Sequence, residues 1–243
     1  MQNENLCKNC DAVFNGNFCP NCSQSASTRR IDAHYILHDI PHSVLHIDKG
    51  LPYTFFRLSI NPGKALLEYL NGKRVSFFKP FAYVIILSTI SSLFIKIASK
   101  DTHVNTDKNI FFLFTHYPSL LIFALIPLVA FISWLVFIKQ KLNYWEHFLM
   151  HTYLAAQINI ILMILHLISI SGILSSANMV LKLTLFNCIY MTYHGYTFSA
   201  LFTNNYKSKF NRRLMFEISC CCFILGFIYA SALIYTGVAV QWF

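Results

Sequence analysis

Residues 80–94 read PFAYVIILSTISSLF and contain no charged side chain. The apolar run continues to about residue 98, with Lys96 as its one charged residue. A helix needs about 20 predominantly apolar residues to cross the hydrocarbon core of a bilayer. The stretch therefore predicts a membrane-spanning helix.

Four other stretches show the same pattern, at residues 116–138, 147–170, 179–203 and 214–238. Pro127 is expected to kink the first of these four. The composition agrees, because 56% of the 243 residues are hydrophobic and only 12% are charged. Soluble domains carry about 25% charged residues. The sequence predicts an all-α polytopic membrane protein with five transmembrane helices over residues 80–243.

The distribution of positive charge predicts the orientation. With a cytosolic amino terminus, segments 1–79, 139–146 and 204–213 lie inside and hold fifteen of the nineteen lysines and arginines. Cytoplasmic segments of membrane proteins carry such an excess. We therefore expect the amino terminus inside and the carboxyl terminus outside. This bias also accounts for most of the formal net charge of +9, so no nucleic-acid partner is expected.

The first cysteines also fit a cytosolic location. Cys7 and Cys10 form one C-x2-C pair, and Cys19 and Cys22 form another eight residues later. Two such pairs can surround one ion with four thiolates in the tetrahedral arrangement that Zn2+ favours. Residues 1–24 are expected to form a structural zinc ribbon holding one zinc ion, with a linker at 25–30. Two disulfides or a redox pair are the alternative, which fits poorly because nothing suggests export.

Residues 31–79 are expected to form amphipathic helices ahead of the first span. On a helical wheel of residues 31–47 the apolar side chains share one arc and the histidines lie opposite. Gly50 and Pro52 are expected to break the chain, and Asn61 to cap a second helix that ends before Gly72. Such helices suit either the cytosolic bilayer surface or the protein's own helix bundle, and both alternatives stay open.

The histidines of the first amphipathic helix recur every four residues: His34, His38, His42 and His46. They lie away from the apolar stripe, which favours a solvated or headgroup-facing surface. Two alternatives are a lipid contact that strengthens as falling pH charges the imidazoles, and weak metal binding by neighbouring pairs.

Three parts of the sequence carry a resemblance: CKNC…FCPNC, HIDKGLPYTFFRLSINPGKALLEYLNGKRVSFFKPFAYV and NYWEHFLMH. Together they resemble a bacterial membrane-protein family catalogued only as a domain of unknown function, with an amino-terminal zinc ribbon and several spans. The resemblance implies a Gram-negative cytoplasmic (inner) membrane protein and brings no known activity. The topology is also similar to the five-span Yip1 family, on architecture alone.

Ionisable residues in or beside the last three spans form a second candidate site near the cytosolic leaflet, because such groups are costly in a bilayer. They are Glu146, His147, His151, His194, Arg212, Arg213 and Glu217. Convergence of these groups could bind a transition metal, relay protons or hold a lipid phosphate. Ordinary hydrogen bonds between helices are the structural alternative.

Two functions follow from these sites. The first is a non-enzymatic membrane protein that organises the bilayer or docks a cytosolic partner through its zinc ribbon. The second is a transporter or lipid-modifying enzyme that uses the cytosolic-leaflet cluster. The absence of a recognised catalytic motif in the sequence favours the first, whereas convergence of His147, His151 and His194 around a cavity would favour the second.

Overall fold

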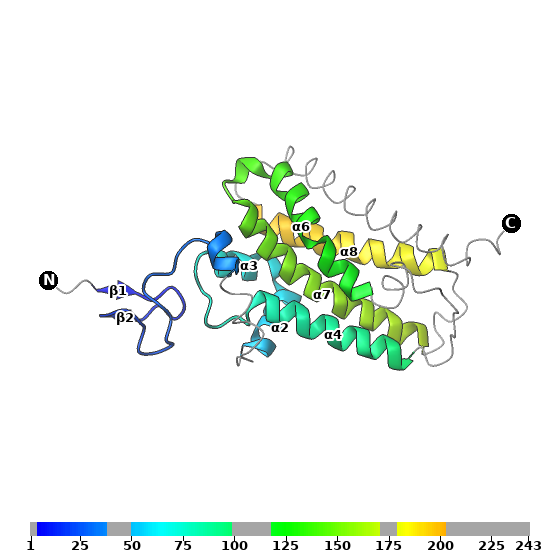
Figure 1. The fold of residues 1–243 in the computed structure, drawn as a ribbon, viewed down its shortest axis with the longest axis horizontal. Helices are drawn as coiled ribbons and strands as arrows, with labels where there is room; N and C mark the ends of the chain where they lie inside the picture. The colour runs from blue at the N-terminus through cyan, green and yellow to red at the C-terminus, as the bar shows by residue number, and fades with distance from the viewer. Residues whose placement is uncertain (1–3, 38–49, 99–117, 171–178, 203–243) are drawn as a thin grey trace.

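The computed structural model describes residues 4–37, 50–98, 118–170 and 179–202. Long helices lie side by side in a bundle, and the amino-terminal segment forms a small separate unit at one end of it (Figure 1). We call residues 4–28 the cysteine module. The described part of the chain is mostly helical, as the sequence predicts.

The cysteine module contains one short hairpin, in which strands β1 (Asn5–Leu6) and β2 (Val13–Phe14) pair antiparallel. Asn5 lies opposite Phe14 and Leu6 opposite Val13. A single bridge between Phe18 and Ser25 closes a second loop. With so few residues buried, hydrophobic packing alone gives the module little stability.

Two short helices connect the module to the bundle, α2 (Leu51–Ile60) and α3 (Pro62–Leu70). The prediction that Pro52 breaks the chain is wrong, because Pro52 lies in the first turn of α2, whereas Gly50 occupies the N-cap directly before that helix. Proline is tolerated there since the first N–H groups have no partner within the helix. The bounds of α3 agree with the prediction, but the Asn61 side chain accepts a hydrogen bond from Tyr196 Oη instead of capping the helix.

Helices α2 and α3 pack on the bundle rather than standing apart from it. A Cβ atom at Gly63 would lie 2.5 Å from Ala200 Cβ and 2.6 Å from the Thr197 carbonyl oxygen, so α3 approaches α8 at backbone distance. Tyr193 Oη also donates a hydrogen bond to the Leu58 carbonyl of α2. Of the two sequence alternatives for this region, the structure favours packing on the bundle.

In the described part of the chain, the bundle contains four long helices: α4 (Pro80–Ala98), α6 (Pro118–Val136), α7 (Tyr144–Ile170) and α8 (Met179–Phe202). A short 3-10 turn, η1 (Ile138–Gln140), leads from α6 towards α7. Helix α7 is central and packs most extensively on α4 and α6. Helices α4 and α7 begin at the end that carries the cysteine module, whereas α6 and α8 end there (Figure 1).

Four of the five apolar ranges predicted from the sequence are thus helical, and the fifth, 214–238, lies outside the described residues. Within the described ranges, α7 alone is long and apolar enough to cross a membrane, over Tyr144–Leu165. That stretch is also largely buried inside the protein, as the core helix of a soluble protein would be. The apolar parts Pro80–Phe94 and Phe123–Val136 are shorter.

Candidate metal centre and the segment it contacts

The two cysteine pairs sit on two turns of the same construction. Cys7 N–H donates to the Ala12 carbonyl and the Cys7 carbonyl accepts from Asp11 N–H. Cys19 repeats both bonds, with the Gln24 carbonyl and with Ser23 N–H. Asp11 and Ser23, each directly after the second cysteine of its pair, have φ values of 59° and 62°. This left-handed step lets both cysteines of a pair point the same way.

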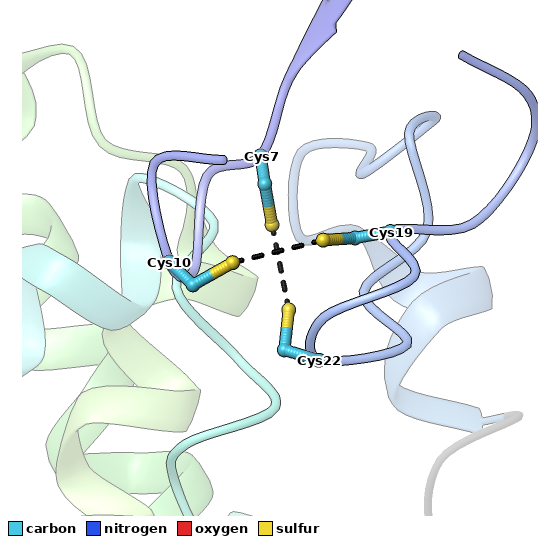
Figure 2. A group of neighbouring side chains, drawn as sticks. All are labelled: Cys7, Cys10, Cys19 and Cys22. Atoms are coloured by element: carbon cyan, nitrogen blue, oxygen red, sulfur yellow. Dashed lines mark hydrogen bonds between the residues drawn. The ribbon is translucent and has the colours of Figure 1, made fainter. Parts of the chain in front are cut away.

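The four sulfur atoms converge on one point, as Figure 2 shows, and all lie within 4.8 Å of one another. The Sγ atoms of Cys7 and Cys22 are 3.5 Å apart, and those of Cys10 and Cys19 are 3.6 Å apart. A tetrahedron with metal–sulfur bonds of about 2.3 Å has edges of about 3.8 Å. All four thiols are free of disulfides. The cysteine module could therefore hold a metal ion, as its spacing predicts.

The surroundings of the sulfurs favour a bound cation. Burial alone would raise the pKa of Cys7, but hydrogen bonds from the backbone N–H groups of Asn9 and Cys10 and from the Cys22 thiol lower that pKa to about 7. Burial raises the pKa of Cys22 to about 12. Without a metal, the two thiols thus do not ionise together at neutral pH, and an ion bound by all four sulfurs would displace protons.

Every backbone N–H of residues 75–78, which we call the junction segment, donates to a named acceptor. Val75 N–H donates to Gln24 Oε1 at 3.2 Å and Ser76 N–H donates to Asn9 Oδ1 at 3.0 Å. The next two, of Phe77 and Phe78, donate to the Arg74 carbonyl and to Thr54 Oγ1. Irregular backbone at an interface needs such partners. The cysteine module supplies two of the four.

Further contacts surround the junction segment. Gly50 approaches it so closely that a Cβ there would lie 2.9 Å from backbone atoms of the segment. Tyr153 Oη, from α7, donates to the Phe78 carbonyl at 2.7 Å. Just before the segment, Arg74 donates to the Arg29 carbonyl, and its guanidinium lies 4.5 Å from the centre of the Tyr35 ring. The cysteine module, α2 and α7 therefore all contact the chain where it enters α4.

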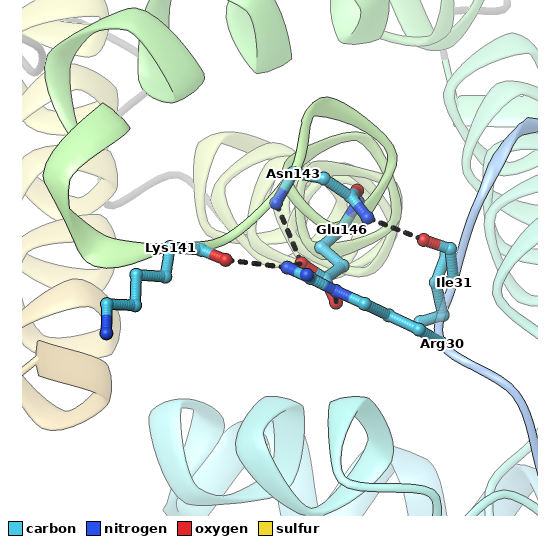
Figure 3. A network of polar contacts seen from close by, with 5 residues as sticks. All are labelled: Arg30, Ile31, Lys141, Asn143 and Glu146. Atoms are coloured by element: carbon cyan, nitrogen blue, oxygen red, sulfur yellow. Dashed lines mark hydrogen bonds and ion pairs between the residues drawn. The ribbon is translucent and has the colours of Figure 1, made fainter.

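A second polar network joins the linker to α7 (Figure 3). Asn143 and Glu146 form a capping box, in which Asn143 Oδ1 accepts from Glu146 N–H and Glu146 Oε2 accepts from Asn143 N–H, both at 2.8 Å. Arg30 donates to both carboxylate oxygens of Glu146 and also to the Lys141 carbonyl. Asn143 Nδ2 donates to the Ile31 carbonyl. Glu146 thus ties the amino-terminal segment to the start of α7.

The described histidines of the second candidate site lie inside the bundle. His147 Nδ1 lies 2.8 Å from Ser133 Oγ of α6, and both side chains are buried. His151 stacks on His194 of α8 with ring centres 5.5 Å apart, and His194 stacks on Phe198 at 4.5 Å. His151 and His194 thus come together, whereas the Glu146 carboxylate is bound by Arg30 and Asn143. Among the described residues, these side chains form no group with the spacing of metal ligands.

The remaining predicted residues are only partly visible. Residues 33–37 are helical with His34 exposed, as expected of a polar face, but Leu37 of the predicted apolar stripe is 68% exposed. The other three histidines of the predicted polar face, His38, His42 and His46, lie outside the described residues, as do Arg212, Arg213 and Glu217.

Sequence reasoning missed the residues that connect the parts. Asn143-Tyr-Trp-Glu146 is a capping-box pattern ahead of an apolar run, so the sequence did contain a signal for this network. Asn9 and Asn21 precede the second cysteine of each pair, a repeat that marks them as part of the turns. Gln24 and Thr54 carry no such signal, because their partners are distant backbone N–H groups.

Comparison with known proteins adds one likeness. Residues 48–92 match the family described as "Protein of unknown function (DUF3667)". The match confirms the resemblance to a family of unknown function over α2, α3, the junction segment and most of α4, and it leaves the cysteine module outside. No curated protein matches this chain. No solved structure matches it either.

Proposed function

We propose that this chain is a non-enzymatic, multi-span protein of the bacterial cytoplasmic membrane, and that its cysteine module is a structural zinc ribbon on the cytosolic face. In this proposal, the module and the start of the helix bundle together organise the membrane surface or dock a cytosolic protein. The observation that carries the proposal is the closed four-sulfur cluster, placed directly against the helix bundle.

The choice of zinc rests on ligand chemistry. Four thiolates at tetrahedral spacing are typical of structural zinc sites, which leave no coordination position open for a substrate. Backbone and amide N–H groups point at the sulfurs, from Asn9 to Cys7 Sγ at 3.4 Å and from Asn21 to Cys10 Sγ at 3.6 Å. Such bonds offset the charge of four thiolates around a divalent ion. Zinc at this site would therefore stabilise the module rather than perform chemistry.

The arrangement of helix ends supports several membrane crossings. Arg30 binds Glu146, so the linker and the start of α7 lie at the same end of the bundle. If α4 and α6 each cross the membrane once, the start of α7 returns to the side that holds the linker. The contact between Arg30 and Glu146 requires this return. Gly63 of α3 contacts Ala200 near the end of α8, so the end of α8 lies on the same side as the start of α4, the end of α6 and the start of α7. The same alternation underlies the five-span, amino-terminus-in arrangement, which is similar to that of the Yip1 family.

Exposed side chains along the helices also fit a bilayer. Large apolar residues on all four long helices face outward, and examples from α4, α6 and α7 are Leu93, Phe131 and Leu167. Contiguous exposed apolar surface is unusual on soluble monomers. Trp145 and Tyr144 lie at the start of α7 beside Lys141, where aromatic and basic residues would meet lipid headgroups.

A docking role for a cytosolic partner draws on the outer surface of the cysteine module. Leu6 and Val13 lie opposite each other in the hairpin and are 66% and 64% exposed, and Phe18 is 65% exposed. The exposed Leu6–Val13 pair is the kind of grouped apolar surface that suits a contact with another protein. The chemistry that suits them is an apolar protein surface.

Metal analysis of the purified full-length protein tests the zinc site. We expect one zinc per chain, complete loss of zinc in the Cys19→Ser/Cys22→Ser variant, and full retention in Cys188→Ser, whose free thiol lies on α8. A wild-type protein without zinc, or a double variant that keeps it, would refute the structural zinc ribbon.

Reporter fusions test the membrane arrangement. A cytosol-active reporter joined after residue 30 and one joined after residue 140 should report the same side of the membrane. The protein should also stay in the membrane fraction after an alkaline wash. Opposite sides for the two fusions, or release by the wash, would contradict the proposed topology.

A further inference from the structure

The cysteine module uses part of its surface on its own chain. Asn9 comes from the first cysteine turn and Gln24 from the end of the second, and both side chains are buried at the contact with the junction segment. Their acceptor oxygens bind two consecutive N–H groups, of Val75 and Ser76. The two acceptors reach neighbouring amides only if both turns are held in a fixed relation to each other.

The four sulfurs are what fixes that relation. The closest sulfur contacts cross from one turn to the other, between Cys7 and Cys22 and between Cys10 and Cys19. Among the described residues, the backbone hydrogen bonds hold each turn separately: Cys7 N–H to the Ala12 carbonyl closes the first, and Ala26 N–H to the Asn17 carbonyl joins the two ends of the second. A module with so small a core depends on its metal to hold such loops together.

Side chains around the two amide bonds make the contact specific. Gly72 has a φ of +110°, and a Cβ there would lie 2.7 Å from Lys8 Cδ and 3.3 Å from Thr28 Cγ2. Gln24 Nε2 donates to Thr28 Oγ1 at 2.7 Å, which orients the amide whose oxygen binds Val75 N–H. The junction segment thus fits a surface built from both cysteine turns and from the residues that follow them.

We propose that the metal-bound cysteine module is an intramolecular binding domain whose partner is the junction segment, and that metal occupancy controls whether this segment is held against α2 and α7. The proposal rests on the proposed zinc ribbon and goes further, since it assigns the metal a role at residues 75–78, inside the stretch that matches the family of unknown function. Loss of metal would separate the acceptors and free the two amides.

Hydrogen–deuterium exchange of the full-length protein in detergent micelles measures this directly, because the donors of the two bonds are themselves exchangeable amides. Removing the metal with a chelator should speed exchange in peptides covering residues 72–78 by about tenfold or more. Adding zinc back should restore the slow rate. Peptides from α7 serve as an internal reference and should change little.

Paired variants separate docking from metal binding. Asn9→Ala/Gln24→Ala should keep one zinc per chain and yet speed exchange at 72–78 as the chelator does, with no further effect of the chelator. Asn17→Ala makes the same substitution at an exposed position of the cysteine module, outside both cysteine turns. That variant should leave exchange at 72–78 slow.

The outcomes are distinguishable from those that test the zinc site. If zinc is bound but its removal leaves exchange at 72–78 unchanged, the intramolecular binding role is wrong and the zinc ribbon stands. Unchanged exchange in the Asn9/Gln24 variant would overturn it equally. If the wild-type protein holds no zinc, the proposed function fails first, and the Asn9/Gln24 variant still decides whether the module binds the junction segment.

Discussion

Arg30 and Glu146 are 116 positions apart in the chain, and the guanidinium of Arg30 donates one hydrogen bond to each carboxylate oxygen, at 2.8 and 2.6 Å. The Glu146 side chain is 5% exposed and the Arg30 side chain 59%. The buried Glu146 carboxylate has little contact with water and therefore needs the hydrogen bonds from Arg30, whereas the exposed Arg30 is hydrated. Hydrogen bonding to Glu146 raises the pKa of Arg30, so the guanidinium keeps its charge and its five donors.

Replacing Arg30 with alanine should lower the free energy of unfolding by about 1–3 kcal/mol, the usual effect of removing a hydrogen bond to a buried charge. Asn143 N–H still donates a hydrogen bond to the Glu146 carboxylate in this variant, which limits the loss of stability. Thermal unfolding in detergent, followed by circular dichroism, measures the change. Arg29→Ala removes the same charge one position earlier and should shift the midpoint much less. Equal shifts in the two variants would show that the bidentate contact has no special role.

Asn143 has two roles that substitutions can separate. Asn143→Ala removes the N-cap of α7, which typically costs about 0.5–2 kcal/mol, and also the bond to the Ile31 carbonyl. Asn143→Ser keeps an N-cap acceptor and loses the longer reach to Ile31. We expect serine to recover part of the stability lost with alanine, measured as the unfolding midpoint. Full recovery would mean that the Ile31 contact contributes nothing.

Gly63 should tolerate no larger residue. Alanine there places a Cβ 2.5 Å from Ala200 Cβ and 2.6 Å from the Thr197 carbonyl, so α3 must move away from α8. Overpacking of this kind typically costs about 1–3 kcal/mol. The adjacent Lys64→Ala, at an exposed position, is the matched control. A Gly63→Ala variant as stable as the control would show that α3 and α8 are not in backbone contact.

Metal retention should fall as the pH falls, because protons compete with the ion for the thiolates. The metal-free pKa of Cys7 is about 7 and that of Cys22 about 12. A bound cation stabilises the thiolate form of each sulfur and so lowers both values. The midpoint of metal release, followed with a chromogenic chelator over a pH series, should therefore lie below 7. Metal retention that does not change with pH, or that improves as the pH falls, would be inconsistent with thiolate ligands.

The local patterns of this chain predicted most of its elements. Four apolar ranges are helices, the C-x2-C spacing brings the four sulfurs together, and the Asn61–Pro62 pair marks the start of α3. The position of Glu146 in a membrane-depth cluster could not be judged from sequence, because its partner Arg30 is distant in the chain. Helix α2 was missed since a proline in a first turn and a proline that ends a helix look alike in sequence.

The cysteine turns are complete long before the rest of the fold exists. Ribosomes add about 5–20 residues per second, so several seconds separate the emergence of Cys22, of Ser76 and of Glu146. The four sulfur atoms lie at most fifteen positions apart in the chain, so the module could take up an ion as soon as they emerge. The junction segment is synthesised next, and Glu146, whose carboxylate binds Arg30, is synthesised later still. The order of synthesis thus favours an order of assembly in which the cysteine turns form first, their contact with the junction segment second, and the contact of Arg30 with α7 after both.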